Sequence, residues 1–187
     1  MRIKSYLFLV KEDEMIAAEL EKKIRAIPDF PVEGVLFRDI TTLLKDEIAY
    51  KTAMDAMLEQ VKNIDFNLVV GIESRGFIFG SLFAYLRGTG FAPVRKKGKL
   101  PSKTKSVSYD LEYGQDILEI HEDAVSNGMK VLIVDDLLAT GGTSAAVVKL
   151  IESLGGEVVG LSYLVELDFL NGREKLQGKN IFSLIHY

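Results

Sequence analysis

The segment VLIVDDLLATGGTSAA at residues 131–146 constrains the fold of this chain more than any other feature of the sequence. A short apolar run ends at two adjacent acids, and small residues then lead into a helical pattern at residues 143–154. Such an uninterrupted apolar run is typical of a strand buried on both faces, as in parallel sheets covered by helices. The segment therefore predicts an α/β fold built around a mostly parallel sheet.

The rest of the chain repeats this alternation. We expect strands at residues 67–72, 91–94, 130–134, 157–164 and 181–185, an antiparallel pair at 106–109 and 117–121, and helices at 15–27, 46–62, 77–86 and 143–154. Pro28 ends the first helix, and the turn-rich stretch at 28–35 is expected to form a loop. The sequence contains neither an internal repeat nor a second domain, so we expect a single domain at residues 15–187, long enough to bury a sizeable core.

Composition argues against several classes of protein. The formal net charge is -4, whereas a sequence-independent grip on nucleic acid needs a broad basic face. No window approaches the roughly 18 consecutive apolar residues of a membrane span. The chain has no cysteine, which excludes disulfides, thiolate metal sites and a cysteine nucleophile and fits a reducing compartment. Charged residues directly follow the short apolar run near the N-terminus, unlike in a signal peptide, so we expect a cytoplasmic protein.

The loop that follows the two acids has the chemistry of an anion site. Residues 140–144 (TGGTS) begin the helix, where glycines, free backbone amides and hydroxyls favour a phosphate. Asp135 and Asp136 would repel a bare polyphosphate but suit sugar hydroxyls or a metal ion, so a sugar phosphate is the favoured ligand. The loop lacks the motifs of a nucleoside-triphosphate P-loop and of a dinucleotide site. An ordinary strand-to-helix turn with capping is the alternative.

At this point the sequence resembles the type I phosphoribosyltransferases, and within them those that act on adenine. The motifs that carry the resemblance are PDFPVEGVLFRDIT (28–41), GIESRGFIFG (71–80), RKKGKLP (95–101), YDLEYG (109–114), VDDLLATGGT (134–143) and VEL with GREKL (165–176). The resemblance implies the α/β fold of that family, with a small N-terminal hood and a mobile lid at residues 95–105. It covers almost the whole chain from Met15 onward, so residues 1–14 are expected to be an N-terminal extension, and translation starting at Met15 is a hypothesis.

The resemblance also implies a reaction. Such enzymes serve purine salvage by combining adenine with 5-phosphoribosyl 1-pyrophosphate, which gives AMP and pyrophosphate. Mg²⁺ would be carried mainly by the phosphoribosyl pyrophosphate, with no metal site formed by the protein alone. The protein would act on small molecules, without nucleic acid or membrane, and would form a homodimer, since closed two-fold assemblies predominate.

Each part of the substrate has expected partners. By resemblance, the ribose and its 5-phosphate would be bound by Asp135, Asp136, Ala139, Thr140, Gly141, Gly142 and Thr143. The pyrophosphate would meet Arg75, Lys99 of the lid and Tyr113. Glu112 would be the catalytic acid or base at the purine, and the base would be read by the backbone around Leu36 and Arg38 with Leu167 packed on its face.

Plainer alternatives remain open at the sequence level. Arg75 and the lid segment are also compatible with an ordinary solvated surface. Glu112 is compatible with an exposed turn residue, and Leu36 and Leu167 are compatible with ordinary core leucines. Two other functions remain open as well. One is a phosphoribosyltransferase for another purine base, such as xanthine or hypoxanthine and guanine, and the other is a non-catalytic, ligand-binding regulator of the same fold.

Overall fold

The computed structural model describes residues 14–111 and 114–187. It divides into two compact units, Met1–Glu59 and Gln60–Tyr187, and each is taken by itself below. Among the described residues, no helix combines the length and the apolar character needed to span a membrane.

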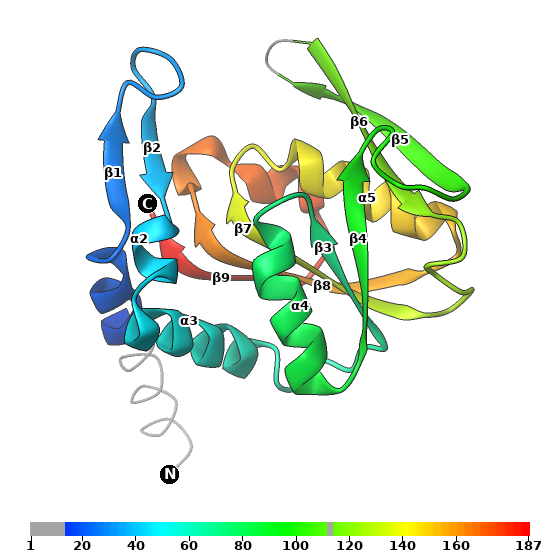
Figure 1. Cartoon of the computed structure of the whole chain (residues 1–187), viewed down its shortest axis with the longest axis horizontal. Coiled ribbons are helices and arrows are strands. Elements are labelled where there is room, and N and C mark those ends of the chain that lie inside the picture. The colour runs from blue at the N-terminus through cyan, green and yellow to red at the C-terminus, as the bar shows by residue number, and fades with distance from the viewer. Residues whose placement is uncertain (1–13, 112–113) are drawn as a thin grey trace. The chain divides into compact units, whose positions relative to one another are not determined.

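The C-terminal unit is built on a seven-stranded sheet of described residues (Figure 1). Its strands are β3 (Leu68–Ile72), β4 (Gly90–Lys96), β5 (Thr104–Leu111), β6 (Gly114–His121), β7 (Lys130–Leu138), β8 (Glu157–Glu166) and β9 (Ile181–His186). They lie in the order β5-β6-β4-β3-β7-β8-β9, and β4, β3, β7, β8 and β9 run parallel. The strands β5 and β6 form an antiparallel hairpin, and β6 pairs antiparallel with β4. The predicted fold class, a mostly parallel sheet flanked by helices, is confirmed.

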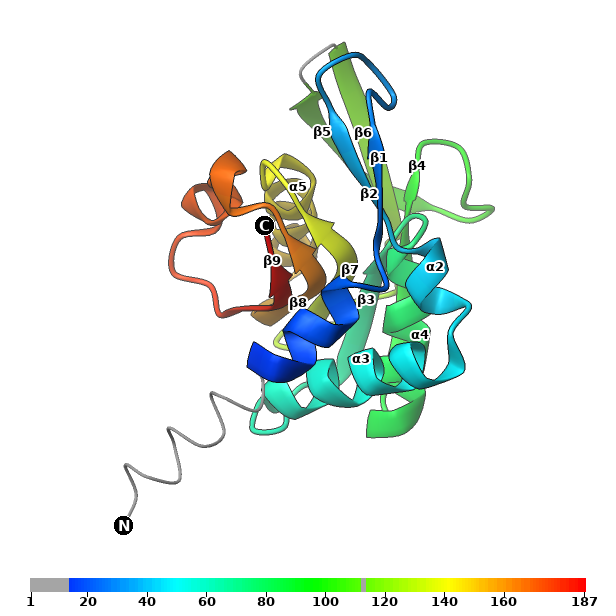
Figure 2. The same cartoon turned by 90° about the vertical axis from the view of Figure 1, so that its left-hand side faces the viewer.

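Two helices cover the sheet, α4 (Gly76–Arg87) after β3 and α5 (Gly142–Ser153) after β7. The connection from β3 to β4 leads toward one edge of the sheet, and the connection from β7 to β8 leads toward the opposite edge. Because such crossovers are right-handed, the two helices lie on opposite faces of the sheet, as Figures 1 and 2 show. The two connections diverge between β3 and β7, and this switch point is where open α/β sheets bind their ligands.

Alternation along the strands decides which side chains pack on which helix. Val70 of β3 and Ile133 of β7 belong to one core cluster with Val147 and Ile151 of α5. On the other face, α4 approaches β3 closely, since a Cβ on Gly80 would lie 3.4 Å from the Cα atom of Gly71. Helices packed on both faces explain why β3 is buried along its whole length.

The N-terminal unit holds a helix at residues 14–21 and an antiparallel hairpin of β1 (Arg25–Pro28) and β2 (Leu36–Asp39). Two helices follow, α2 (Thr41–Leu44) and α3 (Glu47–Gln60). Arg25 and Asp39 join the two strands of the hairpin through an ion pair with a nitrogen–oxygen distance of 2.5 Å. This bond from Arg25 is the main reason that the pKa of Asp39 falls to about 2.

Three boundary predictions were wrong. The helix expected at residues 15–27 ends at residue 21, because residues 25–28 pair with β2, and the expected loop at 28–35 is the turn of that hairpin. The strand expected to end at residue 134 continues through Leu138, since it pairs with β8 along that length, so both aspartates lie within β7. The strand expected at residues 91–94 extends to Lys96 and the one expected at 106–109 begins at Thr104, so both ends of the segment 95–105 belong to strands.

Candidate active site

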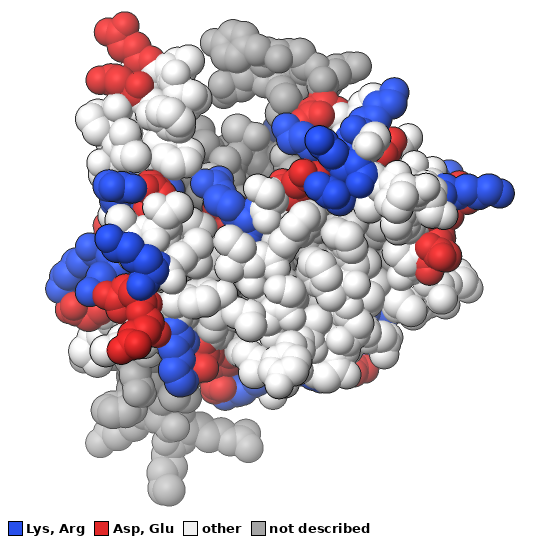
Figure 3. Space-filling model, in the orientation of Figure 1, with Lys and Arg blue, Asp and Glu red and all other residues white. Residues whose placement is uncertain are grey.

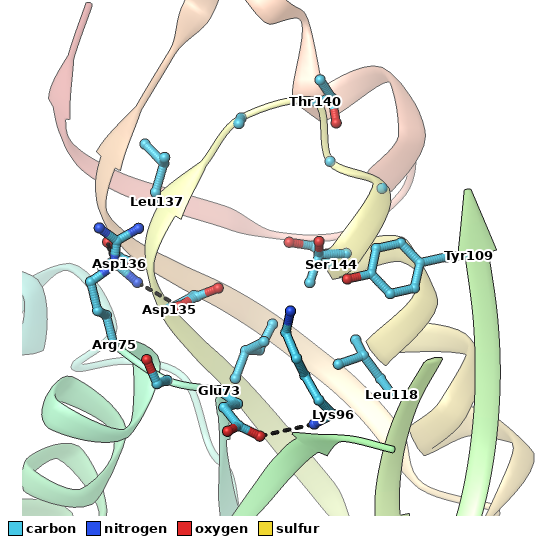
Figure 4. Close-up of a pocket in the computed structure, with 16 residues that line it drawn as sticks. Glu73, Arg75, Lys96, Tyr109, Leu118, Asp135, Asp136, Leu137, Thr140 and Ser144 are labelled. Carbon is cyan, nitrogen blue, oxygen red and sulfur yellow. Dashed lines mark hydrogen bonds and ion pairs between the residues drawn. The ribbon is translucent and has the colours of Figure 1, made fainter. Parts of the chain in front are cut away.

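A cavity of about 420 Å³ lies at the switch point, at the carboxyl ends of β3 and β7 (Figure 4). The cavity is lined by Ile72, the last residue of β3, by residues 73–75 that follow it, by residues 135–137 within β7 and by residues 139–144 after β7. One side chain each comes from β4, β5 and β6, namely Lys96, Tyr109 and Leu118. The sheet therefore brings the predicted phosphate loop, residues 139–143, together with both predicted carboxylates and Arg75.

The phosphate loop passes into α5 with its backbone turned toward the cavity. Gly141 caps the helix with φ of 75°, a left-handed conformation that glycine adopts without strain. The amides in the first turn of a helix have no carbonyl of their own helix to bond, and Gly142, Thr143 and Ser144 line the cavity there. Such amides and the positive end of the helix dipole favour an anion without the help of a cationic side chain.

The two carboxylates on β7 differ in their surroundings. Asp136 is buried and forms an ion pair with Arg75, whose Nε atom lies 2.8 Å from its Oδ2 atom. Asp135 is half-buried, and its Oδ1 atom accepts a 2.9 Å hydrogen bond from the Asp136 amide. Burial and then the neighbouring Asp136 carboxylate raise the pKa of Asp135 well above its ordinary value. Burial also raises the pKa of Asp136, and the Arg75 guanidinium limits that rise.

Lys96 is a cation at this cavity that the sequence interpretation missed. Its Nζ atom points into the cavity (Figure 4). The same atom lies 3.2 Å from the Oδ2 atom of Asp116. The hydrogen bond with Asp116 raises the pKa of Lys96, so the side chain keeps its charge. The predicted cation of this segment, Lys99, lies beyond β4 and outside the cavity lining, where its carbonyl accepts a 3.1 Å bond from Arg95. Had β4 been extended two residues in the sequence interpretation, Lys96 would have been placed at the edge of the sheet.

Glu73 fixes the position of this wall of the cavity. Its two carboxylate oxygens accept bonds of 3.2 and 3.1 Å from Arg95, and the Lys96 amide donates a further bond of 2.9 Å. Partial burial would raise the pKa of Glu73, but these bonds outweigh it and hold the pKa below its ordinary value. Glu73 therefore joins the ends of β3 and β4 and fixes the position of the Lys96 backbone.

A buried pair behind the phosphate loop was also missed from sequence. The Tyr163 hydroxyl of β8 donates a 2.7 Å hydrogen bond to the Ser144 Oγ atom at the start of α5. Both residues are buried, and burial raises the pKa of Tyr163. In the sequence Tyr163 is one position of an apolar strand pattern, so only the three-dimensional structure reveals that its hydroxyl bonds to Ser144.

The remaining predicted residues divide into two groups. Glu112 and Tyr113 lie outside the described residues. Leu36 and Arg38 lie on β2 of the N-terminal unit, and Leu167 follows β8, where its amide donates a 2.9 Å bond to the Leu138 carbonyl. The base-binding assignment draws on both units and stays a prediction.

Magnesium would find suitable donors at this cavity. Mg²⁺ is commonly held by one or two carboxylates together with substrate phosphates and water, and Asp135 and Asp136 line the cavity. Elsewhere in the described part of the chain, Glu166, Asp168 and His186 place ligand atoms within 4.8 Å of one another. Arg173 bonds both oxygens of Glu166 there, so we interpret that cluster as an ion-pair network.

Comparison with known proteins agrees with this geometry. The family model described as "Phosphoribosyl transferase domain" matches residues 39–183. A relative from Acetivibrio thermocellus named adenine phosphoribosyltransferase is 58% identical over 170 residues, 90% of this chain and 99% of the relative. The chain belongs to the adenine phosphoribosyltransferase family.

Solved structures of adenine phosphoribosyltransferases share the fold. The enzyme of Thermoanaerobacter pseudethanolicus superposes with a TM-score of 0.89 at 52% identity, covering 91% of this chain and 99% of the other. The enzyme of Saccharomyces cerevisiae, solved with adenine and an imino-altritol bisphosphate, gives a TM-score of 0.85 at 38% identity, covering 92% and 99%. The expected family, a group of glycosyltransferases, is confirmed.

Proposed function

We propose that the cavity between β3 and β7 is where this chain performs the reaction of its family. The chain transfers the 5-phosphoribosyl group of 5-phosphoribosyl 1-pyrophosphate to adenine, giving AMP and pyrophosphate, a step of purine salvage. The observation that carries the proposal is that one cavity joins an anion site at the start of α5, two carboxylates, and the cations Arg75 and Lys96.

The ribose 5-phosphate part of the substrate fits the β7 side of this cavity. The phosphate loop offers backbone amides and the hydroxyls of Thr140 and Thr143 to the 5-phosphate. Asp135 and Asp136 precede the loop on the same strand and accept hydrogen bonds from the ribose hydroxyls. A carboxylate is a stronger acceptor than a neutral group, which favours a sugar over a simple phosphate ion.

The pyrophosphate leaves toward Arg75 and Lys96. Cleavage of the bond at the anomeric carbon leaves positive charge on the ribose ring and adds negative charge to the departing pyrophosphate. Fixed cations stabilise that second charge as it develops. Asp135 and Asp136 would hold a Mg²⁺ ion that arrives with the substrate, and such an ion would supply further positive charge near the departing pyrophosphate. Lys99 of the lid and Tyr113 complete the proposed pyrophosphate site by family resemblance.

The assignment of the base-binding residues rests on family resemblance. Glu112 exchanges a proton with the purine, the backbone around Leu36 and Arg38 reads its edge, and Leu167 packs on its face. Related enzymes for hypoxanthine and guanine or for xanthine would differ here, so base specificity tests this part separately.

A homodimer is part of the proposal, and the outer face of α4 supports it. Ile78, Tyr85 and Leu86 are spaced to lie on one side of the helix and are 37%, 81% and 54% exposed. Figure 3 shows a broad area without charged side chains over α4. Exposed apolar side chains gathered in an area without charged residues are typical of protein interfaces. We also propose a cytoplasmic location, since a substrate with several phosphate charges does not readily leave water to cross a bilayer.

The proposed reaction is tested by offering the purified protein phosphoribosyl pyrophosphate, Mg²⁺ and each of adenine, hypoxanthine, guanine and xanthine. We expect nucleotide formation from adenine alone, and much less in the Glu112→Gln and Asp136→Asn variants. Faster turnover of another base would overturn the base assignment. Binding of the ribose substrate without any turnover would instead favour a regulator.

A further inference from the structure

A backbone contact joins the phosphate loop to residues 167–176, which follow β8 and which we call the buttress segment. Gly172 in this segment has no room for a side chain, because a Cβ there would overlap the Ala139 carbonyl oxygen and lie 3.1 Å from the Leu138 Cδ1 atom. The contact is reciprocal, since a Cβ on Gly141 would overlap the Gly172 carbonyl oxygen. Gly172 does not have a positive φ, so the close approach alone requires glycine at this position.

An ion pair holds Gly172 in place. Both oxygens of the buried Glu166 carboxylate accept bonds from Arg173, each 2.7 Å long. Bidentate arginine–carboxylate pairs fix geometry as well as charge, and a buried carboxylate is costly without its partner. Because Arg173 directly follows Gly172, the end of β8 determines where the Gly172 backbone lies.

The buttress segment is also attached at both of its ends. At its start, the Leu167 amide donates to the Leu138 carbonyl, and the Asp168 amide donates to the Tyr187 carbonyl, both at 2.9 Å. At its other end, Leu176 is buried in the core cluster beneath α5. With the buttress segment held at three points, an added side chain at Gly172 would displace the phosphate loop.

We propose that Gly172, held by the Glu166–Arg173 pair, is a positioning residue for the phosphate loop. It sets the position of the backbone at residues 139–141 and thereby aligns the amides that follow with the 5-phosphate. The inference rests on the proposed function, in which this loop binds the 5-phosphate. Gly172 does not line the cavity and acts through the loop.

The test is the Gly172→Ala variant of the full chain, with the Kd of ribose 5-phosphate measured by calorimetry and steady-state kinetics measured beside it. Hydrogen bonds weaken steeply when their geometry is disturbed, and those to a charged phosphate are among the stronger ones, so we expect this Kd and the KM for phosphoribosyl pyrophosphate to rise at least about tenfold. The KM for adenine and the kcat at saturating ribose substrate should stay within about threefold, because the base end is untouched.

Gly178→Ala is the matched control. Gly178 has φ of 78°, and a Cβ added there would meet no other atom within 4 Å, so alanine strains the backbone without touching the loop. Its Tm should fall while its Kd for ribose 5-phosphate stays at the wild-type value. A wild-type Kd in Gly172→Ala, whatever its Tm, would overturn the proposal.

A second variant covers the case in which Gly172→Ala does not fold. Arg173→Lys keeps the charge but loses the bidentate bond, and we expect its Kd for ribose 5-phosphate to rise about three- to tenfold. An unchanged Kd in this variant would overturn the positioning role. Failure of the proposed function itself gives a different result, since the wild-type protein would then not bind ribose 5-phosphate.

Discussion

Replacing Asp135 by asparagine should make the ligand-free protein more stable and the ribose site weaker. The pKa of Asp135 is raised well above its ordinary 3.8, by burial and then by repulsion from Asp136. A carboxyl whose pKa is raised by folding binds its proton more tightly in the folded state, so folding stability falls as the pH rises from about 4 through the folded pKa. Asparagine has nearly the same shape and can keep the bond that the Asp136 amide donates. The substitution therefore removes a charge that the fold disfavours.

The effect is modest because Asp135 is half-buried and retains contact with solvent in the cavity. Removing an unfavourable charge commonly raises the free energy of unfolding by about 0.5–2 kcal/mol, and we expect about 1 kcal/mol here. For a chain of this length that gain raises Tm by about 2–4 °C. Loss of a charged hydrogen-bond acceptor should weaken ribose 5-phosphate binding by roughly ten- to a hundredfold.

Thermal unfolding at several pH values between about 4 and 8, with and without ribose 5-phosphate, measures both effects. The difference in Tm between Asp135→Asn and wild type should be smallest at the acid end and grow with pH. Asp65→Asn is the control, because Asp65 is exposed and its hydrogen bond with Lys130 lowers its pKa, so its loss should bring no gain. A Tm difference that is absent at neutral pH, or independent of pH, would refute the reasoning.

Three further predictions concern neighbours of this carboxylate. Lys96→Gln should raise the KM for phosphoribosyl pyrophosphate about tenfold and leave that for adenine unchanged in steady-state kinetics, and equal changes in both would contradict the assignment. Tyr163→Phe should lower the free energy of unfolding by about 1 kcal/mol in urea titrations, and a double-mutant cycle with Ser144→Ala should recover a coupling of similar size. Gly76→Ala places a Cβ 2.8 Å from the Asp135 Oδ1 atom, so it should cost about 1–3 kcal/mol in the same titrations, and an unaffected variant would disprove the close contact.

Local pattern was sufficient to predict most of the sheet. The apolar runs that became β3 and β7 and the helical pattern of α5 are uninterrupted, and burial on both faces leaves few alternatives for such segments. The hairpin of β1 and β2 was not predicted, because Ile24 and Ile27 also fit a helical spacing. The hairpin pairs residues between 8 positions apart, Pro28 with Leu36, and 14 positions apart, Arg25 with Asp39, which a local helical spacing does not reveal.

The candidate site likewise contains residues that a local motif predicts and residues that only the fold brings together. Asp135, Asp136 and the phosphate loop are contiguous, so one motif places them together at the end of a strand. Lys96 and Gly172 come from other strands and connections, and only the sheet order brings them to the cavity or its loop. Arg75 was identified because it directly follows a buried strand, whereas a glycine that packs on a distant backbone leaves no local signal.

The most direct test of the central claim is a crystal structure of the protein with ribose 5-phosphate bound. We expect phosphate oxygens about 3 Å from backbone nitrogens of residues 139–143, with ribose hydroxyls bonded to Asp135 and Asp136. A phosphate bound elsewhere, with the start of α5 left empty, would contradict it.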